Sequence, residues 1–340
     1  MSTPQTAVRK RATLLSYAII FLPFILIAWL HLVTLLLSTF VSYYILTKLR
    51  FGKRLGKKPA VAVFLILLLA VSYGITVFTN QTIASLPEIA DRAIPSVLQW
   101  AERFQVPLPF TDFESLKQVA RETLSNQTNY LRKVAGLAGA AVMHLTLGLI
   151  GCVVAVNLFL NSRLELDRPP SSAPDNLYSL VCDEIAQRFV TFYNSFTTVI
   201  GAQLIISTIN TCLTACFVLL VGYPHPVVII GTTFLCGLLP VIGNLISNSI
   251  IVCIGFEVSA GMAMLALLYL VVIHKLEYFL NSKIIGDRIR NPLWLTLLGL
   301  LLGERLMGIP GMILAPVVLH YVKTETSRIA VPDETPTSAP

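Results

Sequence analysis

The chain has 340 residues, of which 55% are hydrophobic and only 13% are charged, and its formal net charge is +7. Soluble domains carry about 25% charged residues, so this composition excludes an ordinary soluble protein and indicates a polytopic membrane protein. The positive charge does not indicate a nucleic-acid-binding face, because no soluble basic domain accompanies it. Basic residues instead cluster beside apolar segments, where they set the orientation of the chain in the membrane.

No catalytic motif stands in the sequence. It lacks a Walker A sequence, a His/Glu metal pattern and a nucleophile elbow, so ATP-driven transport and hydrolysis both lack their residues. The cysteines have no metal-ligand spacing and are predicted to be small buried hydrophobic residues. We therefore expect no enzyme, no catalytic residue, no metal site and no cofactor. The six cysteines are Cys152, Cys182, Cys212, Cys216, Cys236 and Cys253.

Residues 1–79 are predicted to cross the membrane three times. A basic cluster at Arg9–Arg11 and a second one from Lys48 to Lys58 flank the apolar stretch Thr13–Leu46. Short loops rich in lysine and arginine stay in the cytoplasm. The stretch must then cross an even number of times, and we predict a tight hairpin of two short spans. Ala60–Phe78 crosses outward after it.

Residues 80–134 are predicted to lie outside the membrane as a small helical segment. Ser85 can cap a helix that opens at Pro87, and Thr111–Glu114 matches the capping box of a second helix. Val106–Pro109 separates the two as an extended turn. A segment of this size is expected to pack on its neighbours rather than to be stable alone.

Residues 135–194 are predicted to return to the cytoplasm as one span, followed by a flexible linker at Pro169–Pro174 and an amphipathic helix. Residues 195–323 form the predicted transport core, which begins with the outward span Ser195–Val221. Residues 324–340 are predicted to be a disordered cytoplasmic tail. Both termini then lie in the cytoplasm, and the protein is a multi-pass protein of the inner (plasma) membrane.

Two matched, broken apolar segments are the most informative feature of the core. Val227–Phe256 is interrupted at Leu239–Asn244, and Pro292–Val322 is interrupted at Gly303–Gly311. A spanning helix needs about 20 apolar residues, so about thirty is too long for one crossing and short for two. We therefore predict an all-α fold of about six spanning helices and two re-entrant hairpins, which enter from opposite faces as an inverted repeat requires. Two ordinary, Pro-kinked crossings are the alternative.

Polar residues at membrane depth cost free energy and so indicate a transport path. One face of the span Ser195–Val221 carries a polar stripe at helical spacing, namely Gln203, Ser207, Asn210 and Thr214. Asn244 and Asn248 follow Pro240 and Gly243 of the first interruption, where amides and freed backbone carbonyls could coordinate a cation or a polar solute. The alternative is structural, with polar groups that hold helices together or cap a helix start. The predicted lining of the path is Gln203, Asn210, Pro240, Gly243, Asn244, Asn248, Gly308, Pro310 and Gly311.

Carboxylates near the broken segments have different predicted roles. Glu304 stands beside Arg305 at the tip of the second segment, where it either belongs to a solvated turn or carries a coupling proton. Glu277 ends a predicted span among several cations, which favour the ionised carboxylate, so we predict an interfacial anchor and gate element rather than a proton carrier. Glu257 also stands at a span end. Uncoupled export and antiport are therefore both open.

An ordered set of motifs resembles a known family. The set is Gly201–Gln203, Leu239–Gly243, Leu276–Glu277, Ile284–Gly286, Asn291–Pro292, Leu302–Gly303 and Gly308–Pro316. From about Phe189 to Tyr321 this order is similar to the autoinducer-2 exporter family of bacterial membrane proteins, and the N-terminal layout fits that family too. Two positions depart from it, because Asn244 and Ser282–Lys283 stand where the family usually has proline.

The resemblance implies a secondary transporter that exports a small polar solute, such as autoinducer-2, or exchanges Na⁺ or Li⁺ for H⁺. It also implies a homo-oligomer. The expected partners are the lipid bilayer and the transported solute or ion, and no nucleic acid is expected. The rival from another class is a non-transporting membrane scaffold that docks partners through the exterior helices and the linker. The departures indicate a divergent branch, so the substrate, coupling ion and subunit number do not follow from the sequence.

Overall fold

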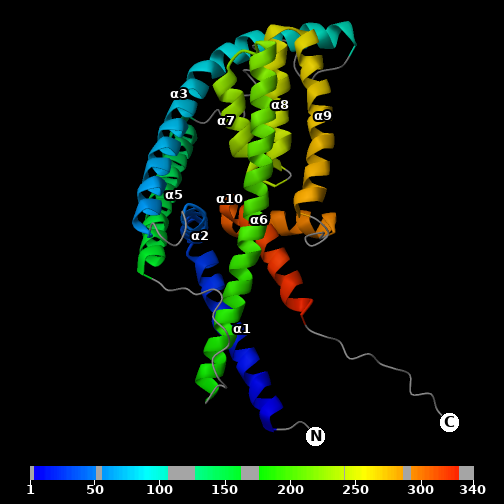
Figure 1. Ribbon diagram of the computed structural model, residues 1–340. Coiled ribbons are helices and arrows are strands. Elements are labelled where there is room, and N and C mark those ends of the chain that lie inside the picture. Colours follow the sequence, from blue (N-terminus) through cyan, green and yellow to red (C-terminus); the bar gives the residue numbers. More distant parts are fainter. Residues whose placement is uncertain are drawn as a thin grey trace, which may run out of the picture. The chain divides into compact units, whose positions relative to one another are not determined.

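The computed structural model describes residues 4–50, 56–105, 127–161, 176–240, 242–285 and 292–328. All regular structure in these ranges is helical, which confirms the all-α prediction (Figure 1). The helices are α1 (Pro4–Trp29), α2 (Val33–Lys48), α3 (Lys58–Arg103), α5 (Gln127–Asn161), α6 (Leu177–Val221), α7 (Pro226–Gly237), α8 (Ile242–Val258), α9 (Ala260–Ile285) and α10 (Leu293–Thr326). Four sequence predictions lie outside the described residues, namely the extended turn Val106–Pro109, the capping box Thr111–Glu114, the linker Pro169–Pro174 and the tail beyond residue 328.

Six described helices are long and apolar enough to cross a membrane. Their candidate spans are Arg11–Trp29, Lys58–Ile89, Gly139–Asn161, Leu177–Val221, Ala260–Glu277 and Trp294–Thr326. Their outer faces expose large apolar side chains, as lipid contact requires. The protein is therefore a multi-pass membrane protein. The six helices are not the six that the sequence predicted. Helix α10 is long enough to be a candidate span, whereas α2, with 16 residues, is too short.

Helix α3 runs without interruption over 46 residues. The predicted helix start at Ser85 is therefore wrong, because Pro87 and Pro95 lie inside the helix. A proline removes one backbone hydrogen bond. Ala101, well beyond both prolines, is nevertheless buried, and tertiary packing of this kind contributes more to a helix than local propensity does. Helix α3 thus continues past its candidate span as the α3 arm, residues 90–103.

Helix α6 also joins two elements that the sequence separated. The predicted amphipathic helix and the predicted span from Ser195 form one helix of 45 residues. Ser195 and Phe196, at the expected boundary, are both buried. Residues at the predicted boundary thus belong to the buried core, and α6 continues through them without a break.

The prediction that the cysteines are buried is wrong. Cys152 and Cys236 are half-buried, and all six cysteines are free thiols. The other four are exposed, namely Cys182, Cys212, Cys216 and Cys253. A thiol behaves as a small hydrophobic group, so the outer face of an apolar helix accepts it as readily as a core does.

The described helices belong to two compact units. Unit 1 comprises Met1–Val33, Arg163–Gly201 and Ile289–Pro340, and it holds α1, the first half of α6, and α10. Unit 2 comprises Thr34–Ser162 and Ala202–Arg288, and it holds α2, α3, α5, the second half of α6, and α7 to α9.

Aromatic side chains pack the three helices of unit 1 together. The Phe192 ring of α6 lies 4.9 Å from the Phe24 ring of α1 and 5.5 Å from the Tyr321 ring of α10, measured between centroids. Phe196 of α6 and Val317 of α10 are fully buried. The interface of α6 with α1 and α10 is therefore apolar and buried at these residues.

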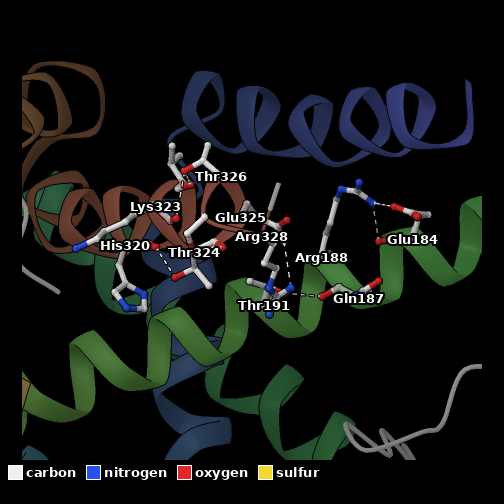
Figure 2. Close-up of polar contacts among 12 residues, drawn as sticks. Glu184, Gln187, Arg188, Thr191, His320, Lys323, Thr324, Glu325, Thr326 and Arg328 are labelled. Carbon is white, nitrogen blue, oxygen red and sulfur yellow. Dashed lines mark hydrogen bonds and ion pairs between the residues drawn. The ribbon is translucent and has the colours of Figure 1, made fainter. Parts of the chain in front are cut away.

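Polar contacts join the same helices of unit 1 (Figure 2). The buried Arg188 of α6 pairs with Glu184 one turn earlier. Its guanidinium also lies 4.1 Å from the centroid of the Tyr17 ring of α1. Arg328, just after α10, donates a hydrogen bond of 2.8 Å to Thr191 Oγ1 of α6. A buried charge needs such partners, so these contacts fix how α1 and α10 lie on α6.

Unit 2 has its own apolar core, in which α8 packs against α3, α7 and α9 (Figure 1). The hydroxyl of Tyr223 lies 3.4 Å from the carbonyl oxygens of Ile251 and Met262. Burial raises the pKa of Tyr223 to about 12, so the phenol stays protonated and able to donate at neutral pH. The core cluster is Val218, Tyr223, Ile229, Ile251, Ile254, Ala266 and Leu270.

A charged cluster closes the open end of the α7–α8 pair. His225 precedes α7, and its Nε2 lies 3.2 Å from Oε2 of Glu257, in the last turn of α8. Arg92 of the α3 arm approaches Oε1 of the same carboxylate at 3.4 Å. The Glu257 side chain is only 2% exposed, and a buried carboxylate needs cationic or hydrogen-bonding partners. The cluster therefore ties both ends of the α7–α8 pair to α3.

Candidate functional site

The first broken segment consists of α7 and α8, and the described residues between them, 238–240, form the first break. The two helices pack against each other beside this break. Gly243 is required there, because a Cβ at this position would overlap the carbonyl group of Cys236. The interruption predicted around Pro240 is therefore confirmed.

Side chains of α6 bind the carbonyl groups that the first break leaves without helical partners. Gln203 Nε2 donates to Gly237 O at 2.6 Å, and Ser207 Oγ donates to Phe234 O at 2.9 Å. Both acceptors lie in the last turn of α7, where carbonyls have no intrahelical partner. The predicted polar stripe thus faces α7. For these two residues the geometry supports the structural interpretation, in which polar side chains hold helices together.

The other two stripe residues differ, because Thr214 has a hydrogen-bond partner and the side-chain oxygen of Asn210 has none in the described structure. Thr214 Oγ1 lies 3.0 Å from the hydroxyl of Tyr269 on α9. Asn210 is buried, and its Oδ1 has no hydrogen-bond partner within the described structure. A buried polar group without a partner costs about 1–3 kcal/mol. A donor group of a solute or a water would recover that cost, so Asn210 is the stripe residue available to a ligand.

Asn244 of α8 contacts a carboxylate of α9. Its Nδ2 donates to both oxygens of Glu277, at 2.7 and 2.8 Å, and both side chains are half-buried. The proposal that Asn244 caps α8 is wrong, because α8 begins at Ile242 and the amide reaches α9 instead. The pair joins the residue just after the first break to the end of the α9 candidate span.

The sequence alone does not connect Asn244 with Glu277. The two residues are 33 positions apart and lie on different helices, so no spacing rule relates them. A weak signal did exist, since both residues stood out separately as polar groups beside apolar segments. Two further predicted lining residues, Pro240 and Asn248, are half-buried in and after the first break.

The second broken segment belongs to unit 1 and is held differently. Within α10 only Gly308 has non-helical backbone angles, at φ 65° and ψ −152°, and we call it the second break. The two parts of α10 meet through glycines, because a Cβ on Gly303 would lie 2.5 Å from the Gly311 carbonyl oxygen. The interruption predicted at Gly303–Gly311 is thus correct in position but narrower than expected. Pro310 is half-buried beside it.

Glu304 lies one turn before the second break. Both Glu304 and Arg305 are exposed, and no side chain in the described part of the chain pairs with the Glu304 carboxylate. Exposure is compatible with the solvated turn and with the coupling proton, so the geometry does not decide between these two predictions.

The polar atoms at the first break are amides, hydroxyls, backbone carbonyls and one carboxylate. Within the described ranges, no three His, Cys, Asp or Glu side chains gather in a group that could hold a metal ion. Oxygen ligands of this kind suit a hydroxylated solute or a hard cation rather than a soft transition metal. Polar groups beside a broken helix are the usual setting of a transport site in a membrane protein.

Comparison with known proteins agrees with this setting. Residues 14–329 match the family described as AI-2E family transporter, a match that includes both units. The chain is also 30% identical over 142 residues to "Putative transport protein YdbI" of Bacillus subtilis (strain 168). That alignment covers 41% of this chain and 41% of the relative, so it spans less than half the length of either protein.

Proposed function

Because the chain belongs to the AI-2E family of transporters, we propose that it is a secondary transporter that exports a small polar solute, with autoinducer-2 as the first candidate. A transporter of this family is a membrane protein and not an enzyme. The observation that supports the proposal best is the Asn244–Glu277 pair beside the first break. An amide and a carboxylate at a helix break can bind solute hydroxyls at a lower cost than an isolated buried charge.

In the proposed path, a solute hydroxyl takes the place of the Asn244 amide as a donor to Glu277. The free carbonyl of Asn210 accepts a second hydrogen bond from the solute. Gln203, Pro240, Gly243 and Asn248 shape this part of the path. In unit 1, the backbone of Gly308, Pro310 and Gly311 is proposed to form the corresponding break.

Exchange of Na⁺ or Li⁺ for protons is the second candidate. The half-buried Glu277 carboxylate supports it, because the carboxylate and nearby backbone carbonyls are oxygen ligands for a cation. Against the prediction of an interfacial anchor alone, the same carboxylate is also proposed to carry a proton. Glu304, the coupling residue that the sequence suggests, is retained as the rival position for that proton.

Flux measurements test these functions directly. Purified full-length protein is reconstituted into proteoliposomes, and autoinducer-2 uptake is compared with Na⁺- and Li⁺-driven proton movement. We expect autoinducer-2 flux above that of empty liposomes, with Asn244→Leu reducing it and the exposed Asn80→Leu leaving it unchanged. A folded protein that moves none of these species, or that is indifferent to Asn244→Leu, would favour the scaffold.

The proposed transport core retains two re-entrant hairpins entering from opposite faces, with both chain termini inside. Cysteine labelling at Gly222 and at Ser259 in a cysteine-free background tests the first hairpin. Ser259 is exposed, whereas the neighbouring Glu257 is too buried to label. Both positions should react from outside the cell. Labelling of Ser259→Cys only from the cytoplasm would mean that α7 and α8 together cross the membrane.

A further inference from the structure

A cavity of about 620 Å³ lies in unit 2 between the α3 arm and the corner where α8 meets α9. Small-molecule sites usually have volumes of about 300–1,000 Å³, so the cavity has the size of a ligand site. None of the residues assigned above to the transport path lines it. Its walls include Gln99, Trp100, Arg103, Phe104, Ser259 and Gly261.

The cavity lies at the ends of membrane spans. The candidate span of α3 ends at Ile89, before the α3 arm begins, and the candidate span of α9 starts at Ala260. The walls therefore stand beyond the apolar part of α3 and at the start of the α9 span, which contributes Ala260, Gly261 and Met264. A solute from water can therefore reach the cavity without crossing the hydrocarbon region of the bilayer.

The walls combine a flat aromatic surface with one cation. The rings of Trp100 and Phe104 lie 5.2 Å apart between centroids. Arg103 and Gln99 are exposed beside them, and neither has a polar partner in the described structure. The lining residues described include no carboxylate. A flat ring can stack on the indole, and a carboxylate on that ring can pair with the guanidinium.

Contacts behind the cavity hold its shape. Trp100 also packs edge-on against Phe256 of α8, with centroids 6.0 Å apart. The Arg92–Glu257 pair joins the α3 arm to α8 next to the same wall. A site that is formed before binding avoids the entropy cost of ordering its own side chains.

We propose that this cavity binds a small organic anion, whose flat ring stacks on Trp100 and whose carboxylate pairs with Arg103. The site is separate from the Asn210–Asn244 path. Binding there can be measured without transport, so its test does not depend on the function proposed above.

Trp100 itself can report the binding. Trp29 and Trp294 are 76% and 66% exposed on apolar helices, so Trp29→Phe and Trp294→Phe should leave a folded protein with one indole. Nicotinate, a flat ring with a carboxylate, is titrated into this full-length protein in detergent, and nicotinamide serves as the neutral match. We expect saturable quenching, with an affinity for nicotinate about tenfold above that for nicotinamide, a factor typical of one charge-assisted contact.

Two variants in the same background locate the site. Arg103→Gln should lower nicotinate affinity to the level of nicotinamide. Gly261→Phe should abolish binding by filling the cavity, because a Cβ there meets only Ser259 Oγ, at 3.7 Å. Gly74→Phe is the matched control, since a Cβ at Gly74 meets nothing within 4 Å and the residue is outside the cavity.

Several outcomes would overturn the proposal. These are quenching that does not saturate, equal affinity for nicotinate and nicotinamide, or binding that survives Gly261→Phe. Addition of phosphatidylglycerol distinguishes a soluble anion from a lipid headgroup. If the lipid displaces nicotinate at equimolar concentration, the headgroup is the occupant and the soluble-anion proposal fails.

Discussion

Two apolar segments of similar length are each interrupted, one between α7 and α8 and the other inside α10. Side-chain hydrogen bonds stabilise the first break, whereas contacts between glycine backbones stabilise the second. At the first break, Gln203 and Ser207 bind the freed carbonyls of α7, and Asn244 binds Glu277. At the second break, only Gly308 has non-helical backbone angles. The two parts of α10 come into contact at Gly303 and Gly311, which have no side chains to keep them apart.

The first break therefore offers side-chain hydrogen bonds, whereas the second offers only backbone contacts. Hydrogen bonds of amides and carboxylates can be exchanged for bonds to a solute, whereas a contact between glycine backbones offers no side chain to a ligand. We therefore infer that solute recognition resides mainly in unit 2. The second break contributes close packing and the geometry of the backbone.

Gly311→Ala tests the packing of the second break. The new Cβ would overlap the Gly303 carbonyl group and approach Met307 at 2.7 Å, so we expect a loss of about 3 kcal/mol in folding free energy. Thermal unfolding in detergent measures the loss. Gly74→Ala, in open space on α3, should keep or raise the stability because alanine is the better helix former. Equal stability of the two variants would show that the parts of α10 are not in contact.

Gln203→Leu tests the polar support of the first break. It leaves the Gly237 carbonyl without its partner, which should cost about 2 kcal/mol of folding free energy. Thr208→Val is the control on the same helix, because the Thr208 hydroxyl bonds only to its own helix at Leu204 O. A Gln203 variant as stable as the Thr208 variant would mean that α6 does not support the end of α7.

Asn244→Ala tests recognition at the first break. Loss of one solute hydrogen bond should weaken solute affinity about two- to tenfold, while membrane insertion stays normal. Concentration-dependent flux in proteoliposomes gives the affinity. Ser249→Ala is the control, since Ser249 is exposed and bonds to Leu245 O of the same helix. Unchanged affinity in the Asn244 variant would remove this residue from the path.

Glu304→Gln should have the smallest effect of the four. Its carboxylate is exposed and unpaired in the described structure, so stability should stay within about 0.5 kcal/mol of the parent. If transport is coupled to protons, Glu277→Gln should abolish the pH dependence of flux and Glu304→Gln should preserve it. The reverse result would place the coupling proton at the second break, in unit 1.

Both breaks could be located in the sequence because they depend on local chemistry. Proline and glycine act on the backbone where they stand, so Pro240, Gly243 and Gly308 marked the positions of the two breaks in or beside the helices. Local chemistry was less reliable elsewhere. Pro87 lies inside a continuous helix, since the packing of the α3 arm outweighs the hydrogen bond that proline removes.

The sequence by itself determined that the protein lies in a lipid bilayer and that its fold is helical. An apolar chain with few charges must satisfy its backbone hydrogen bonds internally in a bilayer, and helices do so segment by segment. Only the tertiary structure decided which polar groups meet. The hydrogen bonds of Gln203 to Gly237 and of Asn244 to Glu277 join residues on different helices. The cavity between the α3 arm and α9 is likewise lined by residues of different helices. Periodicity shows which face of a helix is polar, but the partner of that face depends on how the helices pack.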